Sequence, residues 1–223
     1  MKGIGETMNI FETLNNLIAG ILLENHNYAS IALTGKTTNL PNKLKQWYSV
    51  NSKKIKEIDP SFSKEKYLNN LHMTICNRFH MAPNQYQSLI DIVKSYGKTI
   101  KIECGALDFF DNPRSKSLVI ICRDVENLED FRQYIIQQYE QLPKEKKKKG
   151  GQPVIGRQSF TPHITIAQTK DCPRWAEFKG DTFFEGLKVS FNRGLIEMTD
   201  ESIYYQDLKQ PEIVPQESTE QNK

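Results

Sequence analysis

Strand-like and helix-like segments are intermixed along this chain, and in places one strand follows another with no helix between them. Strands are predicted at residues 99–110 and 118–122, and they are separated by the turn Asp111-Asn112-Pro113-Arg114. Further strands are expected at residues 28–34, 71–75, 163–167, 183–191, 195–198 and 203–208. Amphipathic helices are expected at residues 9–24, 39–58, 83–97 and 127–142. Direct turns together with helical connections predict an α+β or mixed α/β domain.

No internal boundary divides the chain into separate folding units. Its 223 residues, 38% of them hydrophobic, are enough for one sizeable core. We expect a helical extension over residues 1–27, one domain over residues 28–209 and a disordered tail over residues 210–223. The tail is polar and cannot bury a core of its own.

Several protein classes are disfavoured by the sequence. It has no run of 18 apolar residues, so no membrane span is expected, and its first residues lack the pattern of a secretory signal. Four widely spaced cysteines with no CxxC pair indicate reduced thiols. We therefore expect a cytoplasmic protein, monomeric and without a membrane partner.

Two of the four histidines occur in matching segments. The first segment reads LHMTI at residues 71–75, and the second reads PHITI at residues 162–166. Side chains alternate between the faces of a strand, so His72 shares a face with Thr74, and His163 with Thr165. The opposite faces, where a core would take them, carry Met73, Ile75, Ile164 and Ile166. Side by side, two such strands would present two imidazoles and two hydroxyls to one cleft.

This set of side chains suits the transfer of a phosphoryl group from a ribose-linked phosphate. One histidine can deprotonate the attacking hydroxyl or water while the other protonates the leaving oxygen, because the imidazole pKa is close to ~6.5. Threonine hydroxyls can donate hydrogen bonds to the non-bridging oxygens. No further His, Asp or Glu stands at ligand spacing beside either motif, so no metal and no cofactor is expected.

Other residues are candidate substrate contacts. Arg157 stands six residues before the second histidine, and Arg78 lies four residues after Thr74, on the same face if the strand persists. Each could contact a phosphate or be a solvated charge. Tyr204 and its neighbour sit in a late strand whose alternation points only one of them inward, to stack on a base or to pack in the core.

A lysine-rich stretch leads towards the second motif. It could face a polyanion, or it could be a solvated linker. Its candidate substrate-binding residues are Lys146, Lys147 and Lys148. Phe109 and Phe110 are assigned to the core rather than to a platform for a nucleobase.

The motifs resemble those of the two-histidine phosphoesterase superfamily, over about residues 28–208. The segment RQSFTPHITIAQ at residues 157–168 is similar to the second motif and its lead-in, and residues 111–120 resemble the strand–turn–strand between the motifs. The resemblance implies two pseudo-symmetric lobes with antiparallel sheets around a central cleft and helices on the outside. The N-terminal helix departs from the family pattern, as does Gln168, where family members often carry arginine.

The superfamily includes RNA 2′,3′-cyclic phosphodiesterases, 2′-5′ RNA ligases and viral 2′,5′-oligoadenylate phosphodiesterases. The resemblance therefore implies a metal-independent phosphodiesterase for RNA or an oligonucleotide. Two alternatives stay open: a non-catalytic module that binds RNA ends or cyclic nucleotides, and a ligase that runs the reaction in reverse. The intact histidine pair argues against a pure binder, and no lysine nucleophile in a recognisable setting supports a nucleotide-dependent ligase.

Overall fold

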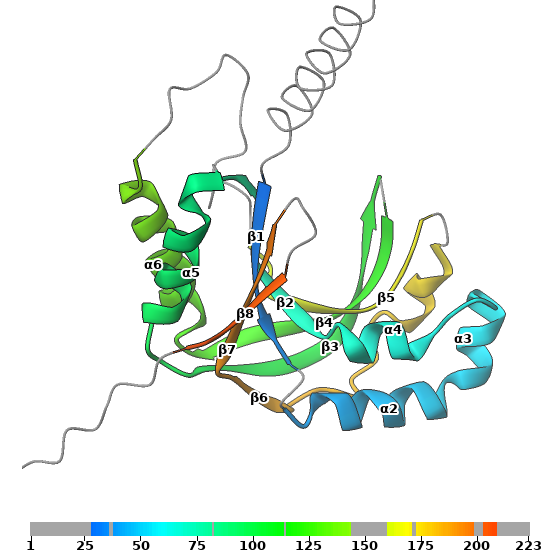
Figure 1. The fold of residues 1–223 in the computed structure, drawn as a ribbon. Helices are drawn as coiled ribbons and strands as arrows, with labels where there is room; N and C mark the ends of the chain where they lie inside the picture. The colour runs from blue at the N-terminus through cyan, green and yellow to red at the C-terminus, as the bar shows by residue number, and fades with distance from the viewer. Residues whose placement is uncertain are drawn as a thin grey trace, which may run out of the picture.

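Two four-stranded antiparallel sheets form the centre of the molecule (Figure 1). The computed structural model describes residues 28–35, 38–81, 83–113, 115–143, 160–170, 173–198 and 203–208. The first sheet has the order β2-β1-β7-β8 and contains β1 (Tyr28–Thr34), β2 (His72–His80), β7 (Arg193–Met198) and β8 (Ile203–Asp207). The second has the order β5-β4-β3-β6 and contains β3 (Ile100–Asn112), β4 (Ser115–Glu126), β5 (His163–Thr169) and β6 (Lys188–Phe191). These sheets confirm the predicted α+β class.

Helices flank the two sheets on opposite sides (Figure 1). Between β1 and β2 the chain forms α2 (Leu40–Val50), α3 (Ser52–Ile58) and α4 (Lys64–Asn69). On the other side lie α5 (Tyr86–Ser95), preceded by the short helix η1 (Pro83–Gln85), and α6 (Leu128–Gln141). A second short helix, η2 (Pro173–Phe178), follows β5 and contacts β3 and β4.

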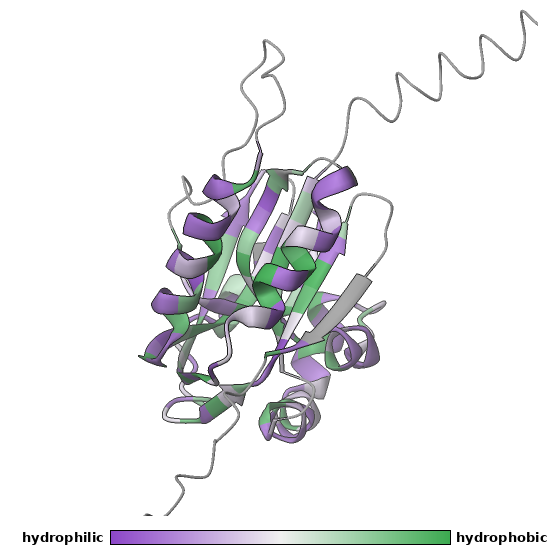
Figure 2. Ribbon diagram, turned by 60° about the vertical axis from the view of Figure 1, so that its left-hand side comes forward, coloured by the Kyte–Doolittle hydropathy of each residue, from purple (hydrophilic) through white to green (hydrophobic). Residues whose placement is uncertain are grey.

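One hydrophobic cluster runs through the described part of the molecule, and the hydrophobic segments in Figure 2 follow the strands and the inward faces of the helices. The spacing of Leu44, Trp47 and Tyr48 places all three on the buried face of α2. Trp47 packs edge-on against Phe178 at 5.0 Å between ring centroids, and its indole N–H donates to Asp181 Oδ2 at 2.8 Å. This contact fixes α2 against the segment that follows β5.

Several element boundaries differ from the sequence-based expectation. The helix predicted over residues 39–58 is two helices, which meet at Asn51, where φ of −98° and ψ of 9° depart from helical values. The short helix α4 was not expected. Of the strand predicted over residues 183–191, only β6 forms; residues 183–186 are a turn that ends at Gly186, whose φ of 77° suits a residue without a side chain.

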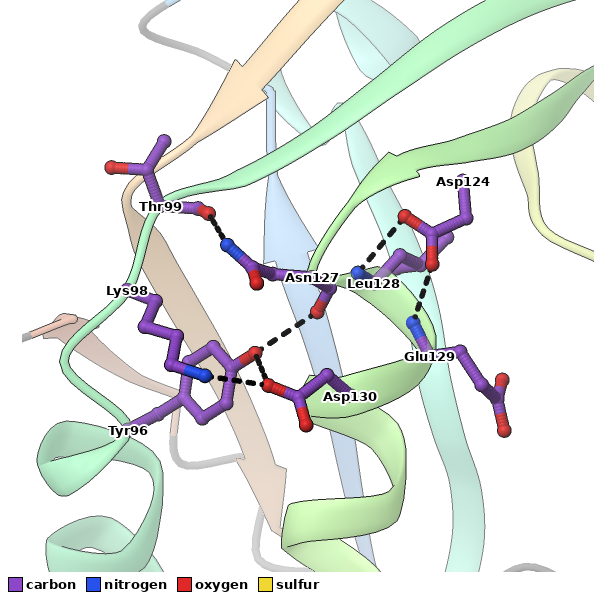
Figure 3. A network of polar contacts seen from close by, with 8 residues as sticks. All are labelled: Tyr96, Lys98, Thr99, Asp124, Asn127, Leu128, Glu129 and Asp130. Carbon is purple, nitrogen blue, oxygen red and sulfur yellow. Dashed lines mark hydrogen bonds and ion pairs between the residues drawn. The ribbon is translucent and has the colours of Figure 1, made fainter.

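The first turn of α6 is capped by an acidic side chain that precedes the helix (Figure 3). Asn127 has a left-handed backbone, with φ of 68°, and its side-chain amide donates to Thr99 O instead of accepting from the helix. The carboxylate of Asp124 accepts the N–H groups of Leu128 and Glu129 instead, at 3.1 and 3.0 Å. Asp124 therefore satisfies the first amides of α6 and favours its N-terminal dipole.

The helix expected at residues 9–24 and the tail expected from residue 210 lie outside the described residues. Among the helices of the described part, none has the length and apolar character needed to cross a membrane.

Candidate active site

The two motif histidines begin equivalent strands in the two sheets. His72 is the first residue of β2, and His163 is the first residue of β5. Each of these strands is the last one at one end of its sheet. β2 and β5 contact each other across the two sheets, and the charge of His72 acts on the ionisation of His163. The fold thus brings the two imidazoles into one site.

Burial along the two strands follows the same pattern. His72 and Thr74 are half-buried, as are His163 and Thr165. The apolar residues between and after them are buried, with exposed fractions of 3% or less: Met73, Ile75, Ile164 and Ile166. The alternation predicted from the two motifs is therefore present in both strands.

Both strands also carry a β-bulge directly after the motif threonine. The register between β1 and β2 skips Ile75, whose neighbours are opposite consecutive residues of β1. In the same way, the register between β4 and β5 skips Ile166. A bulge changes the direction of a strand and the aim of nearby side chains, and bulges are common next to active sites. The matched bulges make the two halves of the site alike in backbone as well as in sequence.

Each imidazole is oriented by a backbone carbonyl two residues earlier. His72 Nδ1 lies 2.6 Å from Asn70 O, and His163 Nδ1 lies 2.7 Å from Thr161 O. A carbonyl oxygen only accepts, so Nδ1 carries the proton in both rings, and Nε2 keeps its lone pair when the ring is neutral. Both rings therefore present the nitrogen that can accept or donate a proton to a substrate.

The surroundings of His163 favour its neutral form. Burial lowers the pKa of His163, the hydrogen bond to Thr161 opposes this effect, and the charge of His72 lowers the pKa further. His163 is therefore suited to accept a proton near neutral pH.

Phe110 contributes to this environment. Its ring lies 4.8 Å from the His163 ring, with 66° between the planes, in an edge-to-face arrangement. The assignment of Phe110 to the core was wrong, because the ring is half-buried and packs on a motif histidine. Its neighbour Phe109 does pack against the core, as expected.

Two tyrosines bind the outer edge of β5. Tyr48 of α2 donates to Ile166 O, the bulge residue, at 2.6 Å. Tyr67 of α4 donates to Gln168 O at 3.0 Å and accepts the N–H of Gln168 at 2.8 Å. These hydroxyls occupy backbone groups that a further strand would otherwise take. Neither tyrosine was identified from the sequence, since only the tertiary structure brings them to β5.

Arg78 is not brought to the motif by strand alternation. β2 extends past it, as the prediction required, but register irregularities interrupt the alternation between Thr74 and Phe79. Arg78 is exposed, has φ of 35°, and its N–H donates to Ser30 Oγ at 3.1 Å. A phosphate contact by Arg78 stays a prediction without structural support.

The other candidate substrate contacts are only partly covered by the structure. Arg157 and the lysines at 146, 147 and 148 lie outside the described residues. Tyr204 lies in β8, where its backbone pairs with Ile196, but its side chain is not described. Across the described ranges, no three His, Cys, Asp or Glu side chains gather as a bound metal ion would require.

No sequence-family profile and no curated protein sequence matches this chain. Solved structures do match it. Usb1 of Kluyveromyces marxianus with uridine monophosphate aligns with a TM-score of 0.55 at 11% identity, over 82% of this chain and 99% of that one. The protein TT0787 of Thermus thermophilus aligns with a TM-score of 0.52 at 13% identity, over 81% and 94%. At these identities the likeness shows a shared fold, which agrees with the predicted α+β architecture of two antiparallel sheets.

Proposed function

We propose, from the two-histidine phosphoesterase fold of this chain, that it is a metal-independent phosphodiesterase acting on a ribose-linked phosphate. The observation that carries the proposal is the matched pair of motifs. Each has a histidine with Nδ1 held by a carbonyl, a threonine on the same strand face and a bulge directly after it. A duplicated arrangement of this kind suits a reaction that needs one proton acceptor and one proton donor.

In the proposed reaction His163 is the general base. Its lowered pKa keeps Nε2 unprotonated near neutral pH, where it takes a proton from the attacking water or hydroxyl. As the new bond to phosphorus forms, the bond to the leaving ribose oxygen breaks. His72, protonated at Nε2, supplies the proton to that oxygen. The hydroxyls of Thr74 and Thr165 donate to the non-bridging oxygens, where negative charge develops.

The proposed substrate is RNA or an oligonucleotide. A 2′,3′-cyclic phosphate or a 2′,5′ or 3′,5′ bond offers the required ribose oxygen as leaving group. The structural neighbour from K. marxianus was solved with uridine monophosphate, which supports a nucleotide phosphate as the bound group. A binding module without turnover would not need two imidazoles that both present Nε2, and this favours the enzyme. A ligase would run the same steps in reverse.

The test is a substrate panel. The purified protein is incubated in EDTA with 2′,3′-cyclic, 2′,5′-linked and 3′,5′-linked oligonucleotides, and the product termini are identified. We expect one class to be cleaved, and His72→Ala and His163→Ala each to lower the rate by about 10²–10⁴-fold without loss of fold. Activity that EDTA abolishes and a metal restores would contradict metal independence. Near wild-type turnover in either variant would contradict the two-histidine mechanism.

A further inference from the structure

The two proposed catalytic histidines lie in different sheets, so strand pairing within one sheet does not set their spacing. β2 and β5 contact each other, but no ladder of backbone hydrogen bonds joins them in the described structure. Contacts other than strand pairing therefore set the spacing of the two strands. The short helix α4 contacts β5 and leads directly into β2.

Tyr67 fastens α4 to the strand that carries His163. Its hydroxyl both donates to Gln168 O and accepts from Gln168 N, so a single side chain pairs with one residue of β5 as a neighbouring strand would. Both bonds are to main-chain atoms and do not depend on the side chain at position 168. Burial raises the pKa of Tyr67, so the hydroxyl keeps the proton it donates.

From the same residue a second chain of hydrogen bonds runs to the other histidine. The carbonyl of Tyr67 accepts the N–H of Asn70 at 3.1 Å. The carbonyl of Asn70 in turn accepts from His72 Nδ1 at 2.6 Å. The end of α4 thus orients one imidazole, while its tyrosine hydroxyl holds the strand of the other.

The Tyr67 ring is itself held by packing. It stacks on Phe62 at 5.4 Å between centroids, with 9° between the planes. Phe62 packs in turn on Tyr48, at 5.3 Å, and on Trp175, at 5.6 Å. Both of those residues are buried, with exposed fractions of 3% and 0%. Packing against Phe62 therefore connects the Tyr67 ring, and with it the hydroxyl, to buried residues of the core.

We propose that Tyr67 is a positioning residue that holds the two catalytic strands at a fixed spacing. The proposal rests on the proposed function for its effect on turnover, but not for its effect on the spacing of the histidines. Loss of the hydroxyl releases the edge of β5 from α4. A small displacement of one catalytic group relative to the other is enough to cost a large part of the rate.

The substitution Tyr67→Phe tests this, because it removes the hydroxyl and keeps the ring that stacks on Phe62. One measurement is the pKa of His163 by NMR, and the other is kcat and KM on the best substrate of the panel. We expect the pKa of His163 to rise towards its ordinary value, because a looser site leaves the ring less buried and farther from His72. We expect kcat to fall about ten-fold or more, with a smaller change in KM.

Two matched controls separate positioning from stability. Tyr96→Phe removes a hydroxyl that also makes two bonds, to Asn127 O and Asp130 Oδ2, in the network at the start of α6 (Figure 3). It should lower the melting temperature without moving the pKa of His163. Gln168→Ala should also leave the pKa of His163 as in the wild type, since Tyr67 bonds only the backbone atoms of residue 168.

The same Tyr67→Phe experiment can overturn the proposal. An unchanged pKa of His163 together with unchanged kcat would do so, as would an equal shift in the Tyr96→Phe control. In the wild-type protein, the backbone N–H of Gln168 should exchange slowly with solvent, because it donates to the Tyr67 hydroxyl. Rapid exchange would also contradict the proposed role of Tyr67. If the wild type cleaves no substrate, the proposed function fails, while the NMR and exchange measurements still decide the role of Tyr67.

Discussion

Tyr48→Phe is expected to destabilise the fold by about 1–2 kcal/mol. Tyr48 is 3% exposed, and its hydroxyl donates at 2.6 Å to the carbonyl of Ile166. Phenylalanine keeps the ring contacts with Trp47 and Phe62, so the change isolates one buried hydrogen bond. For a chain of this length, the loss corresponds to a fall in melting temperature of roughly 2–8 °C. Circular dichroism during reversible heating measures it.

A matched control is available in Tyr134→Phe. The Tyr134 hydroxyl bonds Ser95 Oγ at 2.8 Å in an exposed position, where water replaces the lost partner. Its cost should stay below about 0.5 kcal/mol. If Tyr48→Phe, Tyr134→Phe and the wild type have the same melting temperature, the Tyr48 hydroxyl does not stabilise the bulge. Its hydrogen bond to Ile166 O would then not fix the edge of β5.

Three further predictions concern ionisation and long substrates. The pH profile of kcat/KM should be bell-shaped with its acidic limb below pH ~6.5, because the lowered pKa of His163 keeps the base neutral to lower pH. His72→Gln should raise the pKa of His163 in an NMR titration without restoring its ordinary value, since burial remains; no shift would mean that the rings do not interact. Neutralising the lysines at 146–149 should weaken binding of long oligonucleotides and reduce its salt dependence, with little change for a mononucleotide. Equal loss for both substrates would place these lysines at the reacting phosphate, and no loss would make the segment a solvated linker.

The sequence predicted burial best where apolar and polar residues alternate along a strand. The alternation in residues 71–75 and 162–166 predicted which side chains of both motifs are buried, because a strand has only two faces. The turn between residues 110 and 118 predicted the β3–β4 hairpin for a similar reason. Local patterns of this kind are complete within a few residues, so they can be read without knowing what packs against them.

Features that depend on distant partners could not be read in this way. The bulges at Ile75 and Ile166 arise from the register with β1 and β4, and a motif by itself carries no register. Phe110 looks like any strand aromatic until the hairpin places it against His163. Arg78 shows the same limit: counting residues along β2 fails once the alternation is interrupted.

The two halves of the site are alike in backbone but not in surroundings, and the proposed reaction needs both properties. Matched bulges and carbonyl contacts give each imidazole the same tautomer and a similar aim. Among the ring contacts of the described residues, Phe110 has one partner, the ring of His163. Burial lowers the pKa of that ring. Unequal environments are how a pair of like groups becomes an acid and a base. Phe110→Ala should therefore expose His163 and raise the pKa of its ring towards the ordinary value. The acidic limb of the pH profile should then shift upwards. A limb that does not move would mean that the division of roles has another origin.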